Sequence, residues 1–125
     1  MKYAGLFVLV FFFSCSGSRM IETNLYFGQS RQDGSMITNA EWNGFKKDYI
    51  DKVFKEGSSV INVAGSWYDP SAHKLITEPA YMVIYNYKRS LAISKQIDSL
   101  CYWYKKIFIQ QSVLRVDKKV KATFL

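Results

Sequence analysis

Residues 38–57 read TNAEWNGFKKDYIDKVFKEG and carry the clearest helix signal in the chain. Thr38 stands three residues before Glu41, and at this spacing each side chain can bond a backbone amide in the first turn of a helix. Apolar side chains then recur every three or four residues, at Trp42, Phe45, Tyr49 and Val53. This period places them on one face of a helix that Gly57 would end.

Strand patterns lie on both sides of this helix. Residues 21–27 alternate apolar and polar side chains before it, and residues 59–68 alternate in the same way after it. The turn-forming residues 69–74 lead into a strand over 75–87 that is apolar on both faces, as expected for a central strand. Pro79 predicts a β-bulge near the start of that strand.

The rest of the chain adds a second helix and a fourth strand. Ser90 can cap the helix at its amino end. The apolar stripe of this helix comprises Ile93, Ile97, Leu100 or Cys101, Tyr104 and Phe108. Residues 112–120 then alternate as a strand.

The order strand-helix-strand-strand-helix-strand predicts an α+β, ferredoxin-like domain over residues 21–125. Right-handed crossovers place the four antiparallel strands in the order 4-1-3-2, with both helices on one face. The other face of the sheet then carries apolar and aromatic side chains without a covering layer. Because such a face is seldom left in water, we expect a second copy or a ligand to cover it, and we favour a homodimer.

Residues 1–14 have the features of a signal peptide. A short basic start is followed by ten apolar residues, which reach about 15 Å as a helix, half the thickness of the hydrocarbon layer. Phe12-Phe13-Ser14-Cys15 resembles the lipobox of bacterial lipoproteins, in which Cys15 would receive the lipid. Residues 15–20 would then form a flexible tether. Two alternatives stay open, namely secretion of a soluble protein cleaved after Ser18, and an incidental cysteine in the leader.

Several motifs form a pattern between residues 21 and 117. They are Phe27-Gly28, Ala40-Glu41-Trp42-x-x-Phe45, Gly65-Ser66-Trp67, Glu78-Pro79, and the run from Tyr104 to Asp117 that contains Gln110-Gln111-Ser112-Val113-Leu114. Together they resemble the bacterial family named domain of unknown function 3574. Gln111 stands where that family has Glu, and Gly57-Ser58-Ser59-Val60 departs from its Gly-Leu-Thr turn. The resemblance implies an exported, often lipidated bacterial protein and gives no established activity.

The expected topology brings several of these motifs to one end of the sheet, where the first two strands end and the last two begin. Loops at one end of a rigid sheet are where functional sites usually form. The residues expected to line a candidate pocket there are Phe27, Trp67, Glu78, Gln110, Gln111, Ser112 and Arg115.

Two interpretations of Glu78 are open. As a functional group it would be a general base beside an aromatic wall formed by Trp67. As a structural group it would bond backbone amides near the expected bulge or pair with Arg115. Trp67 has two interpretations of its own, and we expect it in the core rather than in a ligand wall. The single histidine, His73, and the two cysteines are too few to hold a metal, and no cofactor-binding motif is found, so we expect neither a metal nor a cofactor.

The formal net charge is +7, and residues 105–125 carry six cations against Asp117. For an exported protein this charge favours anionic lipid headgroups or envelope glycans as partners, and argues against nucleic acid; a merely solvated tail is the alternative. Two functions therefore remain open. One is a lipid-anchored binding or structural module of the cell envelope that faces the periplasm. The other is a cofactor-free enzyme with Glu78 and residues 110–112 in its pocket.

Overall fold

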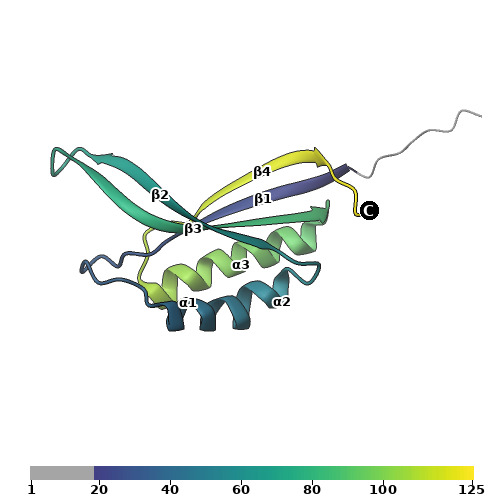
Figure 1. Cartoon of the computed structure of the whole chain (residues 1–125), viewed down its shortest axis with the longest axis horizontal. Helices are drawn as coiled ribbons and strands as arrows, with labels where there is room; N and C mark the ends of the chain where they lie inside the picture. The colour runs from purple at the N-terminus through teal and green to yellow at the C-terminus, as the bar shows by residue number, and fades with distance from the viewer. Residues whose placement is uncertain (1–18) are drawn as a thin grey trace, which may run out of the picture.

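The computed structural model describes residues 19–125, so the expected signal peptide and the candidate lipid-attachment residue Cys15 lie outside the described residues. The described elements follow one another in the order expected from the sequence (Figure 1). They are β1 (Arg19–Gly28), α1 (Asn39–Phe45), the π-helical turn η1 (Lys46–Ile50), α2 (Asp51–Val53), β2 (Ser59–Asp69), β3 (Lys74–Lys88), α3 (Leu91–Phe108) and β4 (Leu114–Lys121).

The four strands form one antiparallel sheet in the order β2-β3-β1-β4. This is the expected order 4-1-3-2 read from the other edge. The helices lie together on one face of the sheet, and the opposite face has no helix over it (Figure 1). The prediction of a ferredoxin-like α+β fold is therefore confirmed.

The first helix begins with the expected capping box. The Thr38 hydroxyl accepts the Glu41 amide at 3.2 Å, and the Glu41 carboxylate accepts the Thr38 amide at 2.8 Å. The helix then widens into the π turn η1 before it narrows again into α2. This wider turn rotates the following residues, so Ile50 and Phe54 are buried while Tyr49 is only half-buried.

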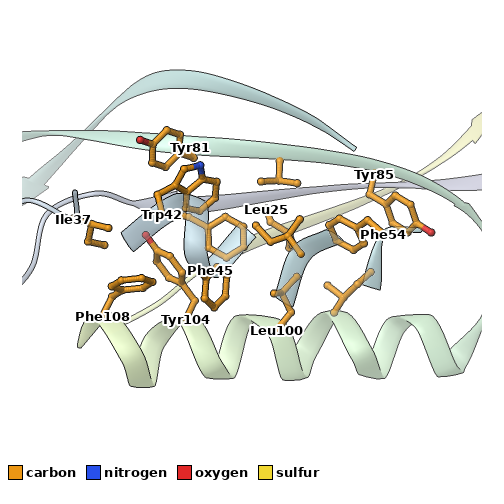
Figure 2. Packing of buried hydrophobic residues seen from close by; sticks show 14 of the residues in the cluster. Leu25, Ile37, Trp42, Phe45, Phe54, Tyr81, Tyr85, Leu100, Tyr104 and Phe108 are labelled. Atoms are coloured by element: carbon orange, nitrogen blue, oxygen red, sulfur yellow. The ribbon is translucent and has the colours of Figure 1, made fainter. Parts of the chain in front are cut away.

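Aromatic rings make up most of the core between the sheet and the helices (Figure 2). Phe27 of β1 meets Tyr104 of α3 with ring centroids 4.6 Å apart, and Trp42 of α1 stacks on Tyr81 of β3 at 4.1 Å. The stripe expected on α3 is confirmed, because Ile97, Leu100, Tyr104 and Phe108 are all buried. Large rings that contact one another across elements fix how the helices lie on the sheet.

β3 passes through Pro79 without the expected bulge, and its register with β2 is continuous, with Ala64 opposite Pro79. The Pro79 carbonyl accepts the Gln29 amide at 2.9 Å, just beyond the last residue of β1. A residue other than proline at position 79 would donate its amide hydrogen to the Gln29 carbonyl. In the structure that carbonyl accepts the Ile37 amide at 2.8 Å instead. Proline is accommodated here because the strand loses no ladder hydrogen bond.

β2 and β3 extend past the end of β1 as a two-stranded hairpin arm, which we define as residues 65–78 (Figure 1). β1 ends at Gly28, which pairs with Ala80. Trp67 in the arm is 49% exposed, so the interpretation of Trp67 as a core residue is wrong. The arm carries it beyond the strands that the helices cover.

The sheet face away from the helices, which we call the open face, is largely apolar. Side chains alternate along a strand, and the residues opposite one another in two strands share a face. The large apolar residues that this register places on the open face are Met20, Tyr26, Ile61, Val63, Trp67, Ile76, Met82, Ile84, Leu114, Val116 and Val120.

Candidate functional site at the end of the sheet

Glu78 lies where the arm leaves the sheet, and its carboxylate faces the end of β1. One oxygen, Oε1, accepts the backbone amide of Ser30 at 3.3 Å. The same oxygen lies 2.5 Å from the place that a Cβ on Gly28 would occupy. The carboxylate therefore packs directly on the backbone of β1, which only a glycine at position 28 allows.

Two side chains from α3 and the loop after it complete this cluster. The Tyr104 hydroxyl donates to the Gly28 carbonyl at 2.7 Å, and the Gln110 amide donates to the Ser30 carbonyl at 2.7 Å. Burial raises the pKa of the Tyr104 phenol, and the negative charge of Glu78 raises it further. Tyr104 is therefore a neutral hydrogen-bond donor that ties the helix layer to β1.

Of the seven residues expected at this end, the structure brings three together. Phe27, Glu78 and Gln110 surround the end of β1, with the Phe27 ring in the core beneath it. Gln111 and Ser112 follow Gln110 but are exposed. Trp67 lies on the exposed arm, two residues beyond the partner of Glu78 in β2.

Arg115 lies on the helix-facing side of the sheet and takes partners other than Glu78. Its guanidinium contacts Asp98 at 2.7 Å and Asp117 at 3.0 Å, and it donates to the Ser94 carbonyl at 3.1 Å. Asp117 also accepts the hydroxyl of the buried Thr23 at 2.5 Å. Arg115 therefore fastens β4 to the first half of α3.

Two residues of the Glu78 cluster, Tyr104 and Ser30, were not expected from the sequence. Tyr104 occupies a position in the apolar stripe of its helix, and the stripe alone does not show where the hydroxyl at the end of the ring will bond. Ser30 contributes only its backbone amide and carbonyl. The one usable signal was Gly28, since a glycine that ends a strand often marks a close approach by another group.

Two shallow hollows of about 280 Å³ each lie between the helices, away from Glu78. The first is lined by Tyr49, Val53, Lys95, Gln96, Ser99, Leu100 and Trp103. The second is lined by Glu41, Gly44, Phe45, Asp48, Tyr49, Ile107 and Phe108. Neither hollow includes a residue of the candidate pocket expected from the sequence.

The remaining reactive side chains do not form a site. Burial raises the pKa of the Cys101 thiol to about 11, which keeps it protonated and unreactive at neutral pH. His73 lies exposed in the turn of the arm. Among residues 19–125, His, Cys, Asp and Glu side chains form no group of three that could hold a metal ion. Within the same residues, no helix is long and apolar enough to cross a membrane.

The fold and the regular sheet register define a ferredoxin-like α+β domain. Residues 22–124 match the family described as protein of unknown function DUF3574, and the chain belongs to this family. The resemblance noted in the sequence motifs is thereby confirmed. Among curated proteins, none matches the chain.

Solved structures share the fold at low sequence identity. A phage SAM lyase without ligand has a TM-score of 0.62 and 15% identity, over 93% of this chain and 99% of the lyase chain. A phage SAM lyase in complex with S-methyl-5'-thioadenosine has a TM-score of 0.61 and 16% identity, over 82% of both chains. CutA from Synechococcus elongatus has a TM-score of 0.52 and 8% identity, over 85% of this chain and 80% of the CutA chain. At these identities the likeness concerns the fold alone.

Proposed function

We propose that this protein is a lipid-anchored module of the bacterial cell envelope that faces the periplasm and serves in binding or organisation. The observation that carries this proposal is that Glu78, the strongest catalytic candidate, makes structural contacts. Its carboxylate packs on Gly28 and accepts the Ser30 amide, so it holds the end of β1 in place. The lipobox-like sequence around Cys15 supports the anchor.

The two cysteines of the chain allow a matched test of the anchor in the full-length protein. Cells that express the wild type, Cys15→Ser or Cys101→Ser would be labelled with palmitate and separated into membrane and soluble fractions. We expect Cys15→Ser to lose the label and move to the soluble fraction, while Cys101→Ser keeps both properties. A Cys15→Ser protein that keeps its label and its membrane fraction would overturn the proposal, and so would a wild type that is unlabelled and found in the soluble fraction.

The module acts as a homodimer in this proposal, with the open faces of two copies packed together. On this face, three large apolar residues are between 44% and 59% exposed, namely Ile61, Trp67 and Leu114. Partly exposed apolar neighbours lie on the same face. A standard interface needs roughly 600 to 1,000 Å² per copy, and the open face is the apolar surface of the sheet that we propose for it.

Two further features, both in the hairpin at the edge of the sheet, support a second copy as the partner. In the free edge strand β2, the stretch 59–68 contains no charge and no proline, although exposed edges are usually protected by such residues. The arm is a two-stranded ribbon, and such ribbons are marginally stable unless something packs on them.

Sedimentation of residues 19–125, which contain every residue of the described core, tests the dimer. Trp67 and Trp103 are 49% and 47% exposed, but Trp67 lies on the open face and Trp103 on the helix layer. We expect twice the monomer mass for the wild type and for Trp103→Glu, and the monomer mass for Trp67→Glu. Tyr68→Glu, on the other face of the arm, should remain a dimer. A monomeric wild type at high micromolar concentration, or a dimer that survives Trp67→Glu, would overturn the open-face interface.

The phage SAM lyase structures favour a second candidate function, a cofactor-free lyase acting on a sulfonium nucleoside. This chain shares that fold, and its Glu78 carboxylate lies near the Tyr104 phenol, close enough to raise the phenol pKa. Purified protein would be incubated with S-adenosylmethionine and the release of S-methyl-5'-thioadenosine followed by chromatography. If the wild type releases S-methyl-5'-thioadenosine and Glu78→Gln does not, the protein is this enzyme rather than a binding module. If the wild type releases none, the lyase is excluded.

A further inference from the structure

Six cations converge on the end of the sheet opposite Glu78. β1 begins at this end, while β3 and β4 finish there, so residues far apart in the sequence become neighbours (Figure 1). Arg19 pairs with Lys121 across β1 and β4, and Lys119 stands opposite Ile21. Lys88 ends β3 and is followed by Arg89, and Lys118 completes the group. We call these residues, Arg19, Lys88, Arg89, Lys118, Lys119 and Lys121, the basic end.

Acidic groups neutralise little of this charge. All six side chains of the basic end are exposed. Glu22 pairs with Lys118 at 2.9 Å. Asp117 contacts Thr23 and Arg115 beneath the sheet. The other five cations of the basic end therefore present their charge to solvent. In the register of the sheet, Lys88 lies on the open face, and Arg19, Lys119 and Lys121 lie on the opposite face.

The position of Cys15 in the sequence limits how far the basic end can lie from a lipid anchor. Four peptide units separate Cys15 from Arg19, and an extended chain advances at most about 3.6 Å per residue, or roughly 14 Å over this distance. A lipid on Cys15 would hold Arg19 within that reach of the membrane surface. The range over which headgroup charges act is about 8 Å at physiological salt, so the nearest cations fall within or close to it.

We propose that the basic end docks on anionic phospholipid headgroups in the leaflet that holds the anchor. This inference rests on the proposed lipid attachment and adds the orientation of the domain. Electrostatic contact would direct the β1 start toward the bilayer, and the turn of the hairpin arm would point away from it. β3 has 15 residues, so the turn would stand on the order of 50 Å from the surface.

Binding of residues 19–125 to lipid vesicles tests the basic end without the anchor. The probes are vesicles of phosphatidylglycerol mixed with phosphatidylcholine, and vesicles of phosphatidylcholine alone. One variant replaces Lys88, Arg89 and Lys121 by Gln. A control variant of the same net charge replaces Lys74, Lys105 and Lys106, which lie in the arm and in the last turns of α3.

We expect the wild-type fragment to sediment with the anionic vesicles and to be released from them by salt. It should not bind vesicles of phosphatidylcholine alone. Each cation near such a surface contributes about a fivefold gain in affinity, so the three substitutions at the basic end should weaken binding about 100-fold. The control variant should keep most of the affinity, because its cations lie at the other end. Thermal melts would confirm that both variants are folded.

Three outcomes would overturn the inference. The first is a wild-type fragment that does not bind anionic vesicles, and the second is an equal loss of affinity in both variants. The third is release of the bound fragment by inorganic phosphate at an ionic strength at which an inert salt leaves it bound. The last outcome would point to a free-phosphate site. Palmitate labelling of the full-length chain reports on the anchor separately, so a failed vesicle experiment leaves the lipid attachment intact and removes only the docking surface.

Discussion

The carboxylate of Glu78 occupies the space that a side chain at position 28 would need, with Oε1 only 2.5 Å from the place of a Cβ on Gly28. This contact joins the base of the hairpin arm to the central strand β1. The adjacent bonds from Tyr104 and Gln110 extend the same junction to the helix layer. The end of the sheet is therefore held by one cluster of side chains that packs on and bonds the backbone of Gly28 and Ser30.

Gly28→Ala should destabilise the protein by about 1 to 3 kcal/mol, because the added methyl group forces the Glu78 carboxylate and the Gln110 amide to move. Gly44→Ala is the matched control, since Gly44 lies in α1 with nothing within 4 Å of its Cβ position. That change should stabilise the protein by about 0.5 to 1 kcal/mol. Urea unfolding of both variants measures the difference, and equal effects would contradict the close contact.

Glu78→Gln should lower the free energy of unfolding by about 1 kcal/mol, because it removes the charge that strengthens the bond from the Ser30 amide. For a domain of this size the loss amounts to a few degrees in melting temperature. A catalytic carboxylate held under strain would behave in the opposite way, and the variant would melt at a higher temperature than the wild type. Thermal melts of the two proteins distinguish these outcomes.

Arg115→Met should cost about 1.5 to 3 kcal/mol, because it leaves the Ser94 carbonyl and Asp117 without their charged partner beneath the sheet. Lys118→Met serves as a control on the same strand. Its ion pair with Glu22 is exposed, so the cost there should stay below about 0.5 kcal/mol. Chemical denaturation checks both values, and similar costs would show that the Arg115 contacts add little to stability.

The stability should fall as the pH rises above 9, in part because of Cys101. Burial raises the pKa of this thiol from its ordinary 9.0 to about 11. Between these values the unfolded chain loses the proton and the folded chain keeps it, so ionisation favours unfolding. The cost reaches about 1 kcal/mol near pH 10.

Cys101→Ala removes this contribution and leaves the tyrosines, which also ionise at high pH, unchanged. Urea unfolding at neutral pH and near pH 10 should therefore show a smaller loss in Cys101→Ala than in the wild type. Identical losses would mean that the thiol ionises equally well in the folded protein.

Local sequence signals were sufficient to predict the order of the elements and the sheet topology. The capping box at Thr38 and Glu41 depends only on residues three apart, and the strand alternation depends only on neighbours, so both could be read without knowledge of the tertiary contacts. The chirality of the crossovers then left one arrangement of the strands. The π turn in the first helix had no such local signal, and it moved Ile50 and Phe54 into the core.

The candidate site was harder to predict because it depends on which face each strand turns to the helices. Leu114 and Val116 flank Arg115, so the alternation of β4 suggests that the charge points away from the core. In the structure the two apolar residues lie on the open face, and Arg115 reaches polar groups on α3. A sheet that is apolar on both sides gives no sequence signal for which side is covered.

β1, one of the two inner strands of the sheet, is also the first strand to be synthesised. β1 forms hydrogen bonds on one side with β3, and on the other with β4, which begins only at Leu114. Pairing of such distant segments is slow, because a long loop must close before either contact stabilises the chain. Until β4 is available, β1 can pair with β3 alone, and its other side stays without a hydrogen-bonding partner. The sheet is therefore completed last at the edge formed by β4.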